Sequence, residues 1–226
     1  MNEEPPLYSD LRNAEPRADR PYVFIDMVTT IDGKTVSGQR GEDVLDLGSQ
    51  ADHQVMRSIQ DQADGVLVGA TTLRAASKRW NPGTAFRIVT ARRGDFDYTV
   101  PFFTGGGRSF VACGSESRFT PESGVERLEA GDEGVEPGLL LNKLREFGCE
   151  RLLCFGGSEL NAQLLEADLV DELFLTVAPK VKLGRGLPTY AGGEPLPRER
   201  MLTFDLVEHH AVGSEIFLRY RRQLIQ

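Results

Sequence analysis

The residues best suited to hold a charged ligand are Gly156, Gly157 and Ser158, which directly follow the apolar run at residues 152–155. The run is typical of a buried parallel strand, the glycine pair ends it, and Ser158 is a candidate N-cap for a helix that continues to about residue 167. A strand, a glycine pair and a helix N-terminus let backbone N–H groups approach an anion, and the helix dipole favours a phosphate there. The same residues also fit an ordinary tight turn, so this pattern alone leaves both interpretations open.

A second turn of this kind follows the short apolar strand predicted at residues 66–68. The segment GATTLR at residues 69–74 begins with a glycine and carries the hydroxyl groups of Thr71 and Thr72. These hydroxyls can bond a polar ligand, or one of them can simply cap the helix that begins there. The chain therefore presents backbone groups for binding at the ends of two strands.

Motifs for most independent chemistry are absent from the sequence. The three histidines, His53, His209 and His210, lack the spacing of metal ligands, and no metal site is expected. Nucleophile-elbow, zinc-protease, Walker, zinc-deaminase and Rossmann glycine motifs do not occur. The three cysteines are scattered, which indicates reduced thiols rather than a disulfide framework. An α/β protein without a nucleophile motif fits a bound cofactor that carries the chemistry.

Composition restricts the possible partners. The chain has 226 residues, of which 40% are apolar and 27% charged, and its formal net charge is −8. These values predict one large domain and argue against a nucleic-acid or anionic-membrane surface. No apolar run approaches the roughly 20 residues of a membrane span, and no signal peptide is apparent, so a cytoplasmic protein is expected. Residues 1–19, with three prolines, are predicted to be a flexible leader, and residues 20–226 a single domain.

The segments that must position the two turns alternate between strands and helices. Strands are predicted at residues 22–28, 66–68, 87–91, 109–113, 125–128, 152–155 and 173–178, helices at 49–63, 137–147 and 158–167, and closing antiparallel strands at 200–209 and 215–223. Between them, residues 34–41 form a polar loop long enough to act as a lid beside a site. This order predicts an α/β fold with a central, mostly parallel sheet flanked by helices and with antiparallel C-terminal edge strands.

Three stretches together resemble a known family. They are YVFIDMVTTIDGKTVSG at residues 22–38, LGSQADHQVMRSIQDQADGVLVGATTLRA at 47–75, and LLCFGGSELNAQLLEADLVDELFLTVAPKVKLG at 152–184. The chain resembles the pyrimidine reductase of riboflavin biosynthesis, the reductase half of the bifunctional riboflavin deaminase–reductase, over roughly residues 20–220. The resemblance implies a dihydrofolate-reductase-like fold, hydride transfer from NADPH to C1′ of a phosphoribosylamino-pyrimidine, a small-molecule substrate and a homodimer formed through the terminal strands.

The resemblance also implies where NADPH would bind. The cofactor residues would be Val28 and Thr29 on the nicotinamide side, Gly69 and Thr72 in the family's V-G-x-x-T turn, and Gly156, Gly157, Ser158, Glu159 and Leu160 in its G-G-x-x-L-N pyrophosphate loop. A cis peptide bond between the two glycines is implied by the likeness to dihydrofolate reductases. Arg92 and Arg93 would either bind the extra phosphate of NADPH or be solvated surface arginines.

The substrate side departs from the family's pattern. The family's A-D-D-P segment is replaced around Ala76 and Ser77, its arginine near the end of the first helix by Gln60, and its glutamate before the glycine pair by Phe155. A ribose phosphate needs cationic and hydrogen-bonding partners, and a phenylalanine cannot accept bonds from its hydroxyl groups. The candidate substrate-binding residues are Lys34, Lys78, Arg79 and Phe155.

Asp32, in the turn that follows the first strand, is the candidate catalytic residue. It would handle a proton or orient the substrate, or it would only cap its own turn. Two other functions stay open. Phe155 and Trp80 would suit the flat ring of another heterocycle, such as a pterin, in a reductase of the same fold. The chain could also be a non-catalytic protein that binds NADPH as a ligand.

Overall fold

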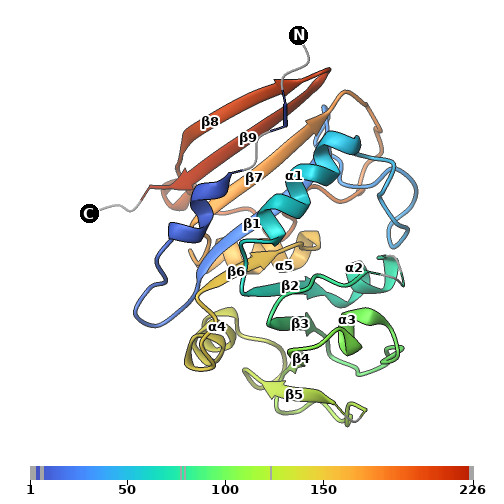
Figure 1. Cartoon of the computed structure of the whole chain (residues 1–226), viewed down its shortest axis with the longest axis vertical. Helices are drawn as coiled ribbons and strands as arrows, with labels where there is room; N and C mark the ends of the chain where they lie inside the picture. Colours follow the sequence, from blue (N-terminus) through green and yellow to red (C-terminus); the bar gives the residue numbers. More distant parts are fainter. Residues whose placement is uncertain (1–3, 6–7, 77, 79, 123, 224–226) are drawn as a thin grey trace.

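The computed structural model describes residues 4–5, 8–76, 78, 80–122 and 124–223. Over these residues, nine strands form one sheet in the order β5-β4-β3-β2-β6-β1-β7-β9-β8 (Figure 1). The elements along the chain are η1 (Ser9–Asn13), β1 (Tyr22–Thr30), α1 (Gln50–Gln60), β2 (Gly65–Gly69), α2 (Ala70–Ala75), β3 (Phe86–Thr90), α3 (Pro101–Thr104), β4 (Arg108–Cys113), β5 (Val125–Glu129), α4 (Pro137–Glu146), β6 (Arg151–Cys154), α5 (Ser158–Glu166), β7 (Glu172–Ala178), η2 (Arg198–Arg200), β8 (Phe204–Val212) and β9 (Glu215–Arg222).

The sheet is parallel except at its C-terminal edge. Strands β1 to β7 pair with one another in parallel, whereas β9 pairs antiparallel with both β7 and β8. The β8–β9 turn contains Gly213, whose φ of 61° lies in the left-handed region that glycine adopts readily. The predicted fold class is therefore confirmed.

Helices cover both faces of the sheet because its central strands are apolar on both sides. On one face, Val23 and Ile25 of β1 pack with leucines of α4 and α5. On the other face, Phe24 packs with Val55 and Ile59 of α1. Figure 1 shows α1 lying across β1 and β7. In α1, Ser49 is the N-cap, as predicted, and its Oγ accepts a hydrogen bond from the Ala51 N–H at 3.0 Å.

Some predicted boundaries of the first helix and of the closing strands were wrong. The first helix ends at Gln60 rather than at residue 63. The closing strands span Phe204–Val212 and Glu215–Arg222 rather than residues 200–209 and 215–223. None of the helices in the described part of the chain is long and apolar enough to cross a membrane.

The predicted flexible leader over residues 1–19 differs from the structure from Tyr8 onward. Tyr8 and Leu11 are buried in the core beneath η1, and the Tyr8 ring lies 4.9 Å from the ring of Phe174 on β7. Local composition suggested a leader because prolines and charges dominate it. The two apolar residues gain their partners from strands far along the chain, and local composition does not report such contacts.

The segment that leads into β1 is held by Asp171, whose side chain is only 2% exposed. Its carboxylate accepts hydrogen bonds from Arg17 Nη2 at 2.8 Å, Arg20 Nη1 at 2.6 Å and the Val23 N–H at 2.8 Å. A buried carboxylate needs partners of this kind, because an unpaired buried charge is costly. These bonds fasten the N-terminal segment to the edge of the parallel sheet.

Candidate functional site

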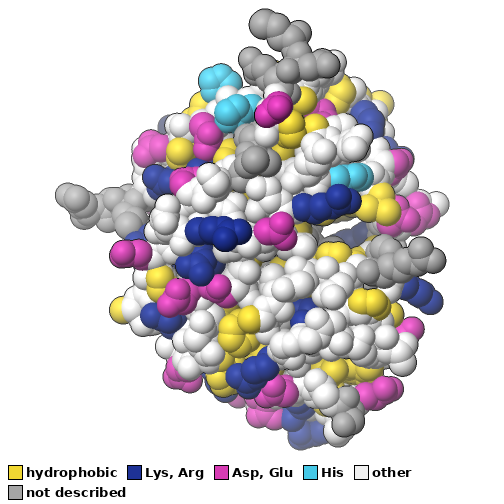
Figure 2. All heavy atoms as spheres, in the orientation of Figure 1, with side chains coloured by type: hydrophobic (Ala, Val, Ile, Leu, Met, Phe, Trp, Pro, Cys, Tyr) yellow, Lys and Arg dark blue, Asp and Glu magenta, His cyan; other side chains and the backbone are white. Residues whose placement is uncertain are grey.

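A cleft of about 700 Å³ lies across the carboxyl ends of the central parallel strands. Its walls come from β1, β2, β3, α1, α2, the start of α5 and the loop that precedes α1. Figure 2 shows the molecule hollowed at mid-height on its right side, between the region of α1 and that of α2. The volume suits a small organic ligand, and carboxyl ends of parallel strands are where open α/β sheets bind ligands.

Two glycine turns approach each other closely in the centre of this cleft. The Gly69 N–H donates to the Gly156 carbonyl at 2.6 Å, and a Cβ on Gly69 would lie 3.3 Å from the Gly157 nitrogen. Gly156 has a φ of 75°, which favours glycine, and a Cβ on Gly157 would lie 2.9 Å from Thr72 Oγ1. The Gly156–Gly157 peptide is cis, as the family resemblance implied.

The N-terminus of α5 opens into the cleft beside these glycines. Gly157 is the N-cap, and no described side chain caps the helix, so Ser158 is the first helical residue rather than the predicted cap. The first N–H groups of a helix have no partner within it, and the dipole makes this end attractive to an anion. Gly157, Ser158, Glu159 and Leu160 all line the cleft. Their arrangement fits a pyrophosphate group.

One end of the cleft is formed by the ends of β3 and the loop after β5. Thr90 and Ala91 line this end together with Gly134 and Val135. Arg92 lines it too, as an exposed side chain, whereas Arg93 is not among the described lining residues. The chain thus supplies one cation where an additional phosphate on a nucleotide could be bound.

The other end of the cleft combines aromatic rings with two carboxyl groups. The rings of Trp80 and Phe155 meet edge to face with centroids 5.7 Å apart. Asp26 on β1 and Asp52 on α1 line the same end, and each residue is only 8% exposed. Burial raises the pKa of Asp26 well above its ordinary value, and the nearby charge of Asp52 raises it further. Burial also raises the pKa of Asp52, against a lowering hydrogen bond from Thr176.

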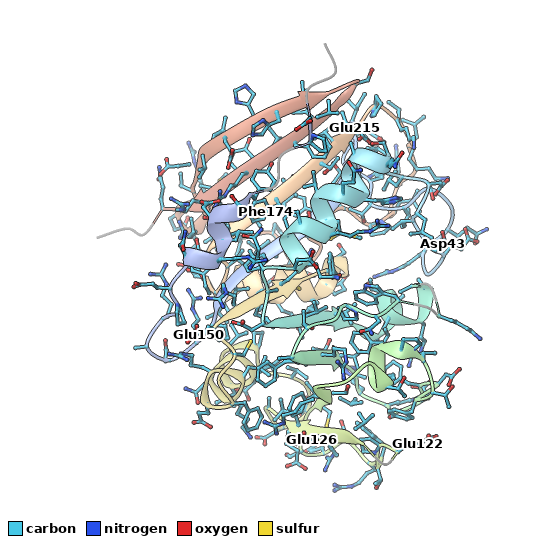
Figure 3. All side chains as sticks on the ribbon, in the orientation of Figure 1. Asp43, Glu122, Glu126, Glu150, Phe174 and Glu215 are labelled. Atoms are coloured by element: carbon cyan, nitrogen blue, oxygen red, sulfur yellow. The ribbon has the colours of Figure 1, made fainter. Side chains whose placement is uncertain are left out.

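A loop before α1 forms the outer wall of the cleft. Residues 40–45 line it, and Figure 3 shows the side chain of Asp43 at the outer part of this loop. Arg40 Nη2 lies 3.6 Å from Glu159 Oε1, so one exposed ion pair joins the loop to the first turn of α5. Exposed pairs of this kind contribute at most about 1 kcal/mol, so this pair adds little to the stability of the loop.

The structure brings most of the predicted cofactor residues together. The cleft is lined by Val28, Gly69, Thr72, Gly157, Ser158, Glu159 and Leu160. Thr29 is buried outside the lining, and Gly156 lies behind it with its carbonyl bound to Gly69. The residues therefore fit a nucleotide cofactor across the strand ends.

Among the predicted substrate residues, only Phe155 is found in the described lining of the cleft. Phe155 lines the cleft, but Lys34 and the exposed Lys78 are not among its described lining residues. Arg79 and Ser77 lie outside the described residues. Gln60 is buried away from the cleft, where its Nε2 donates to the Pro82 carbonyl at 3.0 Å.

Asp32 lies outside the described lining, and its carboxylate is occupied. It accepts bonds from Thr30 Oγ1 at 2.6 Å and from the N–H groups of Lys182 and Leu183 at 3.0 and 2.8 Å. These bonds lower the pKa of Asp32 to about 2, and the bond from Thr30 has the largest effect. The geometry favours the turn-capping role that the sequence left open, since a carboxylate held ionised by three donors is a poor proton carrier.

We expect Asp32→Ala to lower kcat by less than about tenfold, whereas the loss of a catalytic proton donor or acceptor costs about 100-fold or more. The pH profile of kcat should keep its shape. Hydrogen exchange should quicken at Lys182 and Leu183, because both amides lose their acceptor. A profile that loses one limb, with unchanged exchange, would instead assign the proton transfer to Asp32.

Sequence reasoning missed Asp26 and Asp52, although both left a signal. Asp26 interrupts an otherwise apolar strand, YVFIDMV, and an acidic residue is rare in a buried strand unless it has a structural or functional role. Asp52 precedes Val55 by three residues and Ile59 by seven, so it shares the buried face of α1. Their proximity could not be foreseen, because it depends on how α1 packs on β1.

A mostly parallel sheet of this order, with a glycine-lined cleft at its strand ends, is the architecture of the dihydrofolate-reductase-like proteins. The dihydrofolate reductase of Enterococcus faecalis, solved as a complex with NADP(H), superposes with a TM-score of 0.54 at 15% identity and covers 89% of this chain and 96% of its own. At that identity the likeness concerns the fold alone.

The chain belongs to the RibD C-terminal domain family, whose model matches residues 21–218. A protein of Archaeoglobus fulgidus named 2,5-diamino-6-ribosylamino-4(3H)-pyrimidinone 5′-phosphate reductase is 26% identical over 90% of this chain and 100% of its own length. A Thermotoga maritima protein named diaminohydroxyphosphoribosylaminopyrimidine deaminase/5-amino-6-(5-phosphoribosylamino)uracil reductase has a TM-score of 0.71 at 21% identity and covers 90% of this chain. The chain spans 57% of the length of that protein.

Proposed function

We propose that the chain is an NADPH-dependent reductase of the riboflavin-pathway type, which reduces C1′ of the ribosylamino group of an aminopyrimidine phosphate. The observation that carries this proposal is the cleft itself, in which the glycine cradle at the start of α5 continues into a pocket with carboxyl and aromatic side chains. Membership of the RibD C-terminal domain family and the names of the relatives support the same activity.

The cofactor would be held along the strand ends. The N–H groups at the start of α5 would bind the pyrophosphate, with Gly69 and Thr72 against its other side. Val28 would contact the nicotinamide ring, and Arg92 would bind the additional phosphate of NADPH. When bound, NADPH supplies the hydride that opens the ribose to a ribityl chain.

The chain's own contribution would be positioning and the exclusion of water. Trp80 and Phe155 form an apolar wall against which a flat base can lie. The loop at residues 40–45 covers the cleft from outside and limits the access of solvent to the reacting atoms. Lys34, Lys78 and Arg79 remain the candidates for the substrate's phosphate, and the first two would have to move to reach it.

The proposal is tested by following NADPH oxidation with a 2,5-diamino-pyrimidinone ribosylamino phosphate, with its uracil counterpart and with dihydropterin. We expect turnover of at least one of the two pyrimidines and formation of the ribityl product. Turnover of dihydropterin alone would favour the second candidate, a reductase of another heterocycle, for which the Trp80–Phe155 wall is the specific observation. Tight NADPH binding without oxidation in any assay would indicate a non-catalytic binding protein.

Replacing Arg92 by alanine should weaken binding of NADPH about tenfold to 100-fold, because a hydrogen bond to a charged group contributes about 1.5–3 kcal/mol. Binding of NADH, which lacks the additional phosphate, should change little. Calorimetric titration with both nucleotides measures the difference. Arg93→Ala is the matched control, since Arg93 is exposed and outside the described lining. Equal loss for both nucleotides, or a larger effect of Arg93→Ala, would contradict the assignment.

We also propose a homodimer formed through the C-terminal strands. Strand β8 ends the sheet, its outer edge pairs with no strand of the described residues, and it exposes Leu206 and Val207. An exposed apolar edge strand is a template for pairing with another chain, so a second copy of this chain is a reasonable partner.

A further inference from the structure

Resting on the proposed function, we infer that Asp26 reads the base of the substrate and selects a 2-amino-4-oxo-pyrimidine over the corresponding uracil. The carboxylate would accept hydrogen bonds from the 2-amino group and from the adjacent ring N–H. The chain would then reduce the amino-pyrimidinone before any deamination, so a deaminase would have to act on its product.

The position of Asp26 carries this inference. It lies in β1, pairs in register with Phe174 of β7 and lines the cleft while only 8% exposed. Figure 3 shows Phe174 beside α1, between this helix and η1. No described residue donates a hydrogen bond to the Asp26 carboxyl, and no described cation forms an ion pair with it. By contrast, the buried Asp171 accepts hydrogen bonds from three residues within 3.0 Å.

A buried carboxyl without a partner in the chain is costly, so a ligand that supplies its donors should be bound strongly. A carboxylate offers only acceptors, in one plane, and takes two parallel N–H bonds. The 2-amino group and the neighbouring ring N–H of an amino-pyrimidinone present two donors side by side. Uracil presents a carbonyl oxygen where the amino group would be, and this oxygen would face the carboxylate oxygen. Such a mismatch rejects the wrong ligand.

The charges around Asp26 make the preference depend on pH. The charge of Asp52 on α1 acts on Asp26, and Asp52 is itself influenced by His53 and by Glu215 of β9. The charge of Asp26 in turn helps to raise the pKa of Tyr8 in the N-terminal segment. Burial and Asp52 favour the protonated form of Asp26 in the free protein. Two N–H donors stabilise the ionised form, so binding of the amino-pyrimidinone releases a proton and strengthens as pH rises. The protonated acid suits the donor–acceptor edge of uracil, whose binding should weaken as pH rises.

The test compares kcat/KM for the two pyrimidine phosphates in the wild-type chain and in Asp26→Asn, across the pH range in which the chain stays folded. The wild type should prefer the amino compound by about 100-fold or more, as expected when a buried polar group is left unpaired by the wrong substrate. Asparagine presents one donor and one acceptor, so Asp26→Asn should reduce this ratio at least about tenfold, mainly through KM for the amino compound. The rise of the ratio with pH should disappear.

A matched control is Asp61→Asn, which makes the same chemical change at an exposed residue at the end of α1, outside the described cleft lining, and should leave the ratio unchanged. NADPH titration of each variant shows whether the cleft is still formed. A wild-type preference for the uracil compound, or an unchanged ratio in Asp26→Asn, would overturn the inference.

Calorimetric titration of the NADP⁺ complex with both compounds separates this inference from the proposed function, because it does not need turnover. In buffers of different ionisation enthalpy it also counts the protons released. Selective binding of the amino compound with proton release, lost in Asp26→Asn, would support the role of Asp26 even if NADPH were not oxidised, and only the proposed activity would then fail. Equal binding of both compounds would overturn the role of Asp26 whatever the activity.

Discussion

Gly157→Asp is expected to weaken NADPH binding by about 100-fold or more, which corresponds to the loss of one or two hydrogen bonds to a charged group. The new carboxylate would stand at the N-terminus of α5, where the pyrophosphate is expected. It would repel the phosphates, and it would accept hydrogen bonds from the N–H groups that bind the phosphates otherwise. The backbone at Gly157, with a φ of −78°, accepts other residues, and the nearest contact of a Cβ is the rotatable Thr72 hydroxyl.

Gly138→Asp is the control for this experiment. Gly138 lies in the first turn of α4, and a Cβ there would meet no atom within 4 Å. The same change of residue should leave NADPH binding and the thermal midpoint essentially unchanged. If Gly157→Asp bound NADPH like the wild type while folded, the glycine turn would not be the phosphate site. If the wild type bound no nucleotide, the proposed reductase activity would be wrong.

Asp171→Ala should lower the free energy of unfolding by about 2–4 kcal/mol, near the lower end of the range for breaking a buried ion pair. The substitution leaves Arg20 and the Val23 N–H without their acceptor, and both are largely buried. Arg17 is 39% exposed and can be hydrated again, which moderates the loss. Urea unfolding measures the change, and limited proteolysis should show earlier cleavage before β1.

Asp95→Ala provides the comparison, since it makes the same change at an exposed ion pair with Arg74. Exposed pairs contribute at most about 1 kcal/mol, so its unfolding curve should nearly overlay that of the wild type. If the two variants were equally stable, Asp171 would not be what fastens the N-terminal segment.

Much of the fold could be predicted from local patterns. The run at residues 152–155 and the leucines after it correspond to β6 and α5, because a strand buried on both faces and a helix buried on one leave distinct apolar spacings. The glycine pair between them predicted a turn at this place for the same local reason, and the structure has the turn there. The hairpin of β8 and β9 was less accurately bounded, since exposed edge strands carry weaker apolar patterns.

Features that depend on contacts between distant segments could not be predicted. Asp32 is a turn residue in sequence, and its bonds to Lys182 and Leu183 appear only when the loop after β7 folds against it. Asp26 becomes a candidate recognition group only because the packed sheet buries it in the wall of the cleft, without a partner among the described residues. In each case the residue's role depends on how other parts of the chain pack around it.

The N-terminal segment shows that a similarity boundary and a folding boundary need not coincide. The family match begins at residue 21, yet residues 8–20 close one side of the hydrophobic interior and neutralise Asp171. A fragment that begins at residue 21 would expose Phe174. It would also leave the buried Asp171 carboxylate without Arg17 and Arg20. Residues 8–20 therefore belong to the folded unit, although they precede the residues that the family model matches.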